Sequence, residues 1–200
     1  LCTKAYDIEG AVGQIRPAIG PRTVILPFLN GVDSAEKIKR MLPGHAVWDG
    51  CVYVVAFIVE PGRIAEHTNG YRYLFGSAQG PDERLEELER IFTGAEVRAR
   101  LVPDITRRVW DKFAFISTVA TATSYTDEPY GGVLGNPDYR AQFTALLDEF
   151  QAVAKAKGIV LSDGIAAQVV DQMERMPTYT TTSMQRDFRA HRSTELESLT

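Results

Sequence analysis

One lysine in this 200-residue sequence stands where a charged side chain is unexpected. The stretch 105–120 (ITRRVWDKFAFISTVA) has the apolar spacing of a helix, and at about 100° per residue Lys112 projects from the middle of its apolar arc, opposite Ala114 and Thr118. An ammonium that loses hydration has a lower pKa, and such lysines serve as acids, bases or Schiff-base formers. Alternatively, its stem lies on apolar surface and its head reaches water. The pattern alone leaves both interpretations open.

A carboxylate near the end of the sequence also has two interpretations. Thr194 and Glu197 fit a capping box, which predicts a helix that starts at Thr194 and has Glu195 at its first position. The helix dipole favours a negative charge there, which explains Glu195 without any ligand. The same position offers a fixed acceptor for hydroxyl or amide groups of a ligand. Ser183, similarly, is either an exposed helical serine or a ligand contact.

A third polar candidate is Asn30, which is followed by Gly31 and preceded by the apolar run 23–28 (TVILPF). Such dipeptides are common in turns, because asparagine and glycine tolerate positive φ. At the carboxyl end of a parallel strand, the dipeptide would also lie at the ligand crevice of an open α/β sheet.

The elements that position these residues change character along the chain. Up to Pro103, short β-rich runs alternate with helical stretches, which is typical of an α/β sheet domain. The chain is expected to open inside a strand. The predicted strands are 23–28, 46–59, 63–67, 72–75 and 96–102, and the predicted helices are 33–41 and 82–92.

After Pro103 the pattern is helical throughout. Asn136 before a proline predicts a helix start, Gly158 predicts the stop, and Ser162 is a candidate cap for the next helix. The predicted helices are 105–120, 136–158, 162–173, about 181–192 and one from 194 onward.

We therefore predict an α/β part over 1–103 and an all-α part over 104–200. The chain opens on Leu1 without an initiator methionine, and it ends just after a helix is expected to begin. We expect a fragment of a longer polypeptide. The apolar helix 136–158 fits either a core or the interface of a homodimer.

Composition excludes several classes of function. The net charge is -4 with acids and bases mixed, unlike the basic footprint of a nucleic-acid binder. The longest apolar run, 51–59, is too short to span a membrane, and no signal peptide is present. Two cysteines are too few for a disulfide framework, so a cytoplasmic location is the expectation. The three histidines are far apart in the sequence, and no metal is predicted.

Together these segments resemble the ketopantoate reductase (2-dehydropantoate 2-reductase) family, in the 6-phosphogluconate-dehydrogenase-like group. The resemblance covers essentially the whole chain. Its motifs are TKAYD from residue 3, LNGVDSAE from residue 29, EPGRIAEHTNG from residue 60, WDKF from residue 110 and SMQRDFRAHRSTE from residue 183. It implies the C-terminal part of an NADP-binding Rossmann domain, a truncated helical domain, and reduction of a 2-keto acid by NADPH, as in pantothenate biosynthesis.

The resemblance also implies roles for single residues. Lys112 matches the catalytic lysine, which polarises the ketone and protonates the developing alkoxide. The positions that match cofactor contacts are Lys4, Asn30, Ala56 and Glu195. The positions that match substrate contacts are Asn30, Lys112 and Ser183.

The sequence departs from the family pattern in two ways. Ile116, Ala120 and Tyr130 stand where the family commonly has substrate-binding asparagines, so we hypothesise a bulkier or less hydroxylated 2-keto acid. No G-x-G-x-x-G occurs in the 200 residues, so we expect this chain alone to bind NADPH poorly and to be inactive. The alternatives are a non-catalytic paralogue that serves as a dimerisation or binding module, and a related hydroxy-acid or opine-type dehydrogenase.

Overall fold

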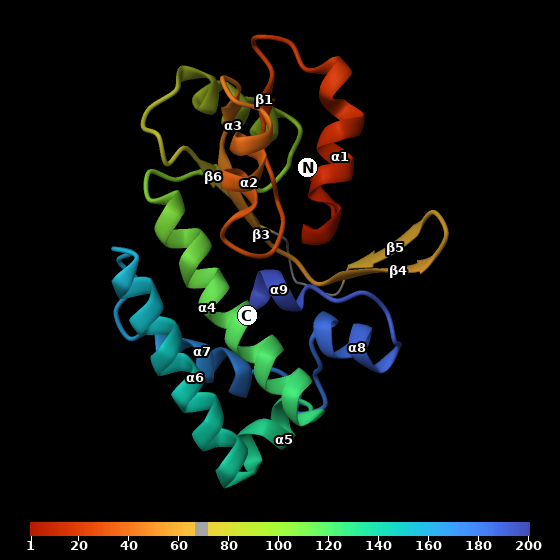
Figure 1. Ribbon diagram of the computed structural model, residues 1–200, viewed down its shortest axis with the longest axis vertical. Helices are drawn as coiled ribbons and strands as arrows, with labels where there is room; N and C mark the ends of the chain where they lie inside the picture. Colours follow the sequence, from red (N-terminus) through yellow and green to blue (C-terminus); the bar gives the residue numbers. More distant parts are fainter. Residues whose placement is uncertain (67–71) are drawn as a thin grey trace. The chain divides into compact units, whose positions relative to one another are not determined.

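The computed structural model describes residues 1–66 and 72–200, which divide into two compact units (Figure 1). The first unit comprises Leu1–Thr3, Asp7–Leu29 and Ser34–Arg108, and the second comprises Lys4–Tyr6, Asn30–Asp33 and Val109–Thr200. The two short segments of the second unit come from the part of the sequence that is rich in predicted strands. They carry Lys4 and Asn30.

The strands of the first unit form small sheets. They are β1 (Val24–Ile25), β2 (Ala46–Val47), β3 (Asp49–Tyr53), β4 (Ala56–Glu60), β5 (Arg63–Glu66), β6 (Arg72–Gly76) and β7 (Ala99–Leu101). β1 and β2 pair in parallel, while β6 is antiparallel to β3 and parallel to β7. β4 and β5 form a separate antiparallel hairpin (Figure 1).

Several predicted strands differ from the observed ones. The run 46–59 is divided into β2, β3 and β4, because the chain changes its pairing partner after Val47, and uniform apolar content does not reveal such a change. β1 is shorter than predicted, since Pro27 has no N–H for a ladder. β5 ends at Glu66, and the last residue of that predicted strand, His67, lies outside the described residues.

The helices of the first unit cover these strands. They are α1 (Ile8–Ile15), α2 (Ser34–Met41) and α3 (Glu83–Gly94), with the 3₁₀ turns η1 (Ala5–Asp7) and η2 (Arg16–Ala18) near the start of the chain. α2 and α3 confirm their predictions. α1 was not predicted because Gly10 and Gly13 lower its helix propensity, although Ile8 and Val12 are buried at helical spacing. Leu1 does not open in a strand. Within residues 1–66 and 72–200 it makes two isolated backbone bonds, to the Leu26 carbonyl and from the Phe28 N–H.

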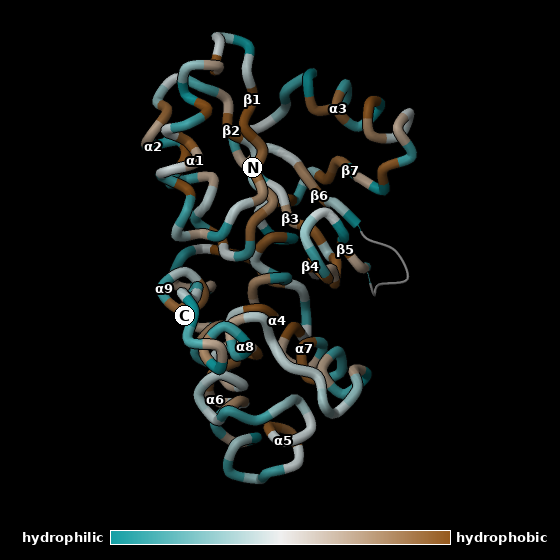
Figure 2. The backbone as a smooth tube through the Cα atoms, turned by 90° about the vertical axis from the view of Figure 1, so that its right-hand side faces the viewer, coloured by the Kyte–Doolittle hydropathy of each residue, from teal (hydrophilic) through white to brown (hydrophobic). Residues whose placement is uncertain are grey.

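The core of the first unit has two parts. Ile8 of α1 and Ile38 of α2 pack with Ile25 and Val47 of the parallel strand pair. The other part packs α3 against the β3–β6–β7 sheet around Trp48, Phe75 and Leu85. β1 lies within a continuous hydrophobic stretch of chain, drawn brown in Figure 2.

The second unit is helical. Its helices are α4 (Ile105–Thr126, from Val109 on in this unit), α5 (Tyr130–Gly135), α6 (Pro137–Ala156), α7 (Ile165–Glu174), α8 (Ser183–Arg189) and α9 (Leu196–Leu199). The predicted start of α6 is confirmed, since the Asn136 side chain accepts hydrogen bonds from the N–H groups of Asp138 (2.9 Å) and Tyr139 (3.3 Å). Its stop is confirmed by Gly158, whose φ of 71° is left-handed. A mixed α/β part followed by a helical part confirms the predicted fold class.

α4 is buried on more than one side. Ala114 and Thr118, expected on the polar side, are both 0% exposed, so that expectation is wrong. They are buried because α4 packs against α6 and α7 in one core cluster, whose members include Ala114, Phe143 and Val169. Figure 1 shows the three helices side by side. None of the helices in the described ranges is long and apolar enough to cross a membrane.

Two predicted helix caps are wrong. α7 begins after Gly164, whose φ is 67°, and Ser162 instead donates hydrogen bonds to Asp111 from Oγ (2.6 Å) and from its backbone N–H (2.9 Å). α9 begins at Leu196, and no side chain in the described part of the chain caps it, so the capping box at Thr194 does not form.

Candidate active site

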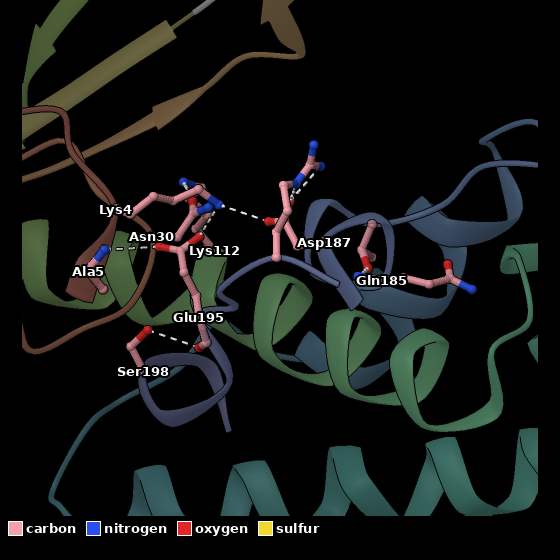
Figure 3. Close-up of polar contacts among 10 residues, drawn as sticks. Lys4, Ala5, Asn30, Lys112, Gln185, Asp187, Glu195 and Ser198 are labelled. Carbon is pink, nitrogen blue, oxygen red and sulfur yellow. Dashed lines mark hydrogen bonds and ion pairs between the residues drawn. The ribbon is translucent and has the colours of Figure 1, made fainter. Parts of the chain in front are cut away.

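The unusual lysine is held by an asparagine that is distant in sequence. Lys112 is half-buried on α4, and its Nζ donates a hydrogen bond to Oδ1 of Asn30 at 2.9 Å (Figure 3). Asn30 begins a turn in which Gly31 has a φ of 98°. A Cβ at Gly31 would lie 3.4 Å from the backbone oxygen of Ser198, so glycine gives both the turn and the close approach to α9.

A buried carboxylate lies in the same group of residues. Glu195 is 5% exposed, and its Oε2 accepts a hydrogen bond from Lys4 Nζ at 2.9 Å. Its Oε1 accepts a hydrogen bond from the backbone N–H of Ala5 at 3.2 Å. A buried carboxylate is costly unless it is paired and hydrogen-bonded, and Glu195 has both kinds of partner. The interpretation of Glu195 as an exposed carboxylate that only complements the helix dipole is therefore wrong.

A second carboxylate contacts the same ammonium. Asp187 on α8 accepts a hydrogen bond from Lys4 through Oδ2 at 3.3 Å, and its Oδ1 contacts the Arg192 guanidinium at 2.7 and 3.0 Å. Burial lowers the pKa of Lys4, but the hydrogen bond and charge of Glu195, followed by those of Asp187, raise it above its ordinary value. Lys4 is therefore a cation at neutral pH.

The structure brings together four of the six predicted site residues within the second unit. Figure 3 shows Lys4, Asn30, Lys112 and Glu195 gathered at one place, although they are far apart in the sequence. The other two are exposed: Ser183 is the first residue of α8, and Ala56 is in β4 of the first unit.

The three departures from the family asparagines have apolar surroundings. Ala120 is 3% exposed and packs with Met184 of α8 and Leu199 of α9, and Ile116 packs against the same cluster. Tyr130 is buried in the main core of the unit, and burial raises the pKa of its hydroxyl to about 12. Each replacement therefore has a packing role in this chain.

Asp187 and Arg192 are the polar residues of this group that the sequence did not single out. A signal was present, because they lie five positions apart within the SMQRDFRAHRSTE motif that ends in Glu195. An acid and a base at that spacing are also common on solvated surfaces, so the signal is weak.

The second unit thus combines ammonium, amide and carboxylate groups in a partly buried setting. Lys112 offers N–H donors, and Asn30 fixes one of them. Such a group can bind a carbonyl or carboxylate oxygen and transfer a proton to it. The paired charges of Lys4, Asp187 and Glu195 hold neighbouring parts of the chain in place.

Known proteins share this sequence pattern and fold. A family model described as ketopantoate reductase PanE/ApbA matches residues 1–80, and one described as its C-terminal part matches residues 104–200. An uncharacterized oxidoreductase of Bacillus subtilis (strain 168), YkpB, is 26% identical over 196 residues, which are 98% of this chain and 65% of that protein.

Solved structures give the same result. A PanE/ApbA family ketopantoate reductase from Ralstonia eutropha JMP134 superposes with a TM-score of 0.89 at 25% identity, over 99% of this chain and 64% of that one. A 2-dehydropantoate 2-reductase from Porphyromonas gingivalis W83 has a TM-score of 0.79 at 36% identity, over 99% and 66%. The chain spans less than two thirds of the length of these relatives. With both of its parts matched by models of one family, the chain belongs to the ketopantoate reductases of the PanE/ApbA type.

Proposed function

We propose that the complete gene product carrying this sequence reduces a 2-keto acid to a 2-hydroxy acid, with NADPH as the hydride donor and Lys112 as the general acid. One observation carries the proposal: the half-buried Lys112 ammonium is held at 2.9 Å by Asn30. Membership of a reductase family supports the reaction class.

Lys112 has two tasks in this reaction. Its Nζ donates a hydrogen bond to the ketone oxygen, which polarises the carbonyl group. As negative charge develops on that oxygen, Nζ transfers a proton to it and becomes a neutral amine, which bulk water reprotonates. General-acid help of this kind contributes roughly 10²–10⁴-fold. Asn30 holds Lys112 through an acceptor bond, which fixes the ammonium before the substrate arrives.

The residues of the group fit a nicotinamide nucleotide at its reactive end. Lys4 is partly exposed and Asn30 carries an amide, so both offer donors to amide, hydroxyl or carbonyl groups, and Glu195 offers an acceptor. These three residues would hold the cofactor, and Ala56 of the first unit stays a separate prediction of a cofactor contact. When bound, the reduced nicotinamide supplies the hydride.

We further propose a substrate with fewer hydroxyl groups than ketopantoate. Ile116 and Ala120 belong to an apolar cluster with Met184, one and two turns of α4 beyond Lys112. An apolar wall does not hydrogen-bond a hydroxyl group, so an alkyl or aryl 2-keto acid loses fewer interactions with water when it binds there.

Kinetics on the complete gene product test these proposals. We expect turnover with NADPH faster than with NADH, and higher kcat/KM for 2-ketoisovalerate or phenylglyoxylate than for ketopantoate. A clear preference for ketopantoate would overturn the substrate proposal. Absence of turnover with every 2-keto acid and both cofactors would overturn the reductase and favour a non-catalytic paralogue.

The 200-residue chain gives a separate measurement. Because it contains no G-x-G-x-x-G, a titration of NADPH fluorescence against it should show only weak binding, and a micromolar Kd would contradict this prediction. A cytoplasmic location stays a prediction from the cysteine content.

A further inference from the structure

Asp187 makes contacts that neither the general acid nor the substrate wall requires. Its carboxylate is 13% exposed and uses each oxygen for a different cation: Oδ2 for Lys4 at 3.3 Å and Oδ1 for Arg192 at 2.7 Å. Figure 3 shows Asp187 directed toward Lys4, whose ammonium also contacts Glu195. Asp187 therefore links the Lys4–Glu195 pair to Arg192.

Backbone hydrogen bonds also connect the segment of Asp187 with that of Arg192. The N–H of Arg192 donates to the backbone oxygen of Asp187 at 2.9 Å, and the N–H of His191 donates to that of Phe188 at 3.0 Å. His191 has a φ of 51°, the left-handed conformation that commonly follows the last turn of a helix when these two bonds form. The start of the turn between α8 and Glu195 is therefore held by backbone bonds as well as by the Asp187–Arg192 ion pair.

The charges of this group balance only when Lys4, Asp187, Arg192 and Glu195 are all present. Lys4 and Arg192 supply two positive charges, and Asp187 and Glu195 supply two negative ones. Without the Arg192 cation, two carboxylates would share one ammonium. The Lys4 ammonium would then be attracted to both carboxylates, and its ion pair with Glu195 would weaken.

We propose that Asp187 and Arg192 are positioning residues, which fix the turn before α9 and thereby hold Glu195 and Lys4 in their observed arrangement without touching substrate or cofactor themselves. This proposal rests on the proposed function in one respect, namely that Lys4 and Glu195 face the cofactor. The arrangement itself is a property of the folded chain.

Kinetics of three variants of the complete gene product test the proposal. Arg192→Met removes the cation, and we expect kcat/KM to fall about tenfold with the melting temperature unchanged. Arg192→Lys keeps a charge that can still reach one oxygen of Asp187, and it should restore activity to within about threefold of wild type. Asp171→Asn breaks an exposed pair with Arg175 (2.8 Å) on α7 and serves as the control, with no change in rate.

Several results would overturn the proposal. One is an Arg192→Met enzyme with wild-type kcat/KM. Another is an Arg192→Lys enzyme as slow as Arg192→Met, because a role that depends on the charge must be rescued by a cation. If Arg192→Met does not fold, Asp187→Asn replaces it with the same expectations.

Hydrogen exchange separates this proposal from the reductase proposal. In Arg192→Met, backbone amides of residues 190–196 should exchange about tenfold faster, whereas amides of α7 should exchange at the wild-type rate. If no 2-keto acid is turned over, the reductase proposal fails while this exchange result still supports the positioning role. Unchanged exchange in 190–196 overturns the positioning role whatever the activity.

Discussion

The two units of this molecule use charged side chains differently. In the first unit, the ion pairs Glu36–Arg40, Glu60–Arg63 and Asp82–Arg84 join residues two to four positions apart, and the longer Lys39–Asp49 contact, at 3.9 Å, joins two neighbouring elements. In the second unit, Lys4 joins Asp187 and Glu195 across 183 and 191 positions. The carboxylates of the second group are also the more buried, at 13% and 4% exposure of their side chains.

This difference separates charges that form local contacts from charges that we assign to the proposed reaction. A pair within one helical turn or hairpin costs little to form and contributes little, about 0.2–1 kcal/mol when exposed. A buried pair gives up hydration, so apolar residues of similar size are often as stable. Glu195 is buried while its partner Lys4 is partly exposed, and we therefore assign this pair to the proposed reaction rather than to stability.

The largest expected effect is on the rate of the proposed reaction, with the fold unchanged. Lys112→Ala in the complete gene product should lower kcat by about 10²–10⁴-fold, because the general acid is lost. Cofactor affinity and melting temperature should stay close to wild type. Stopped-flow assays with the best 2-keto acid and a fluorescence titration of NADPH measure the two quantities separately.

Lys155→Ala is the matched control, since Lys155 is an exposed lysine in the last turn of α6. It should leave kcat unchanged. If Lys112→Ala retained more than about a tenth of the wild-type kcat, the general-acid assignment would be wrong.

The second prediction concerns the buried pair. Among the described residues, Lys4→Met leaves the Glu195 carboxylate with the Ala5 N–H as its one remaining partner, and we expect a loss of about 2 kcal/mol in the free energy of unfolding. Glu195→Gln should cost about 1 kcal/mol, because an amide can still accept the Ala5 hydrogen bond. Urea unfolding followed by circular dichroism measures both.

A double-mutant cycle makes this prediction specific to the pair. The combined Lys4→Met and Glu195→Gln variant should be about 1 kcal/mol more stable than the sum of the single effects allows. Additive effects would mean that the two side chains contribute independently, and the contrast between the units would then lose its energetic basis.

Local signals were enough to predict part of this structure. The cap at Asn136 and the stop at Gly158 act within a few residues, so the sequence contains the whole interaction. Helical periodicity placed Lys112 on an apolar arc of α4, and the half-buried position of its side chain agrees with that prediction. α2 and α3 were predicted for the same reason, because each has one apolar face.

The remaining features depend on contacts that a sequence pattern does not encode. The pairing of Lys4 with Glu195 requires the folded second unit, and a capping box suggested a different fate for Glu195. Thr118 is buried because α4 packs on several sides, whereas periodicity assumes one buried face. The division of 46–59 into strands depends on which neighbour each piece pairs with.

The third prediction tests a charge that serves the fold in the first unit. Hydrogen bonds from Arg84, strongest among several causes, lower the pKa of the Asp82 carboxyl to about 2. Because this pKa lies below its ordinary value of 3.8, the stabilisation is present above about pH 4 and is lost as the pH falls through 2. Asp82→Asn should therefore lower the free energy of unfolding by about 1 kcal/mol at pH 7, because water screens a charge at the surface, and hardly at all near pH 2.

Asparagine at position 82 still accepts the Arg84 N–H that caps α3, so the substitution isolates the charge. Trp48, whose Nε1 donates to Asp82 at 3.2 Å, provides a fluorescence probe of unfolding. Glu86→Gln removes the same charge from an exposed position on α3 and should have no effect at either pH. A pH-independent loss for Asp82→Asn would mean that shape, not charge, explains the contribution of this residue.

The smallest expected effect comes from an exposed pair on α2. Glu36 and Arg40 lie 3.2 Å apart at helical spacing, with side chains that are 71% and 65% exposed. Glu36→Gln should change the free energy of unfolding by at most about 0.5 kcal/mol, and 0.5 M salt should reduce even that difference, because water and ions screen the pair. A coupling between Glu36 and Arg40 as large as that between Lys4 and Glu195 would show that burial and sequence separation do not decide how much an ion pair contributes here. The reason to assign the Lys4–Glu195 pair to chemistry rather than to stability would then be gone.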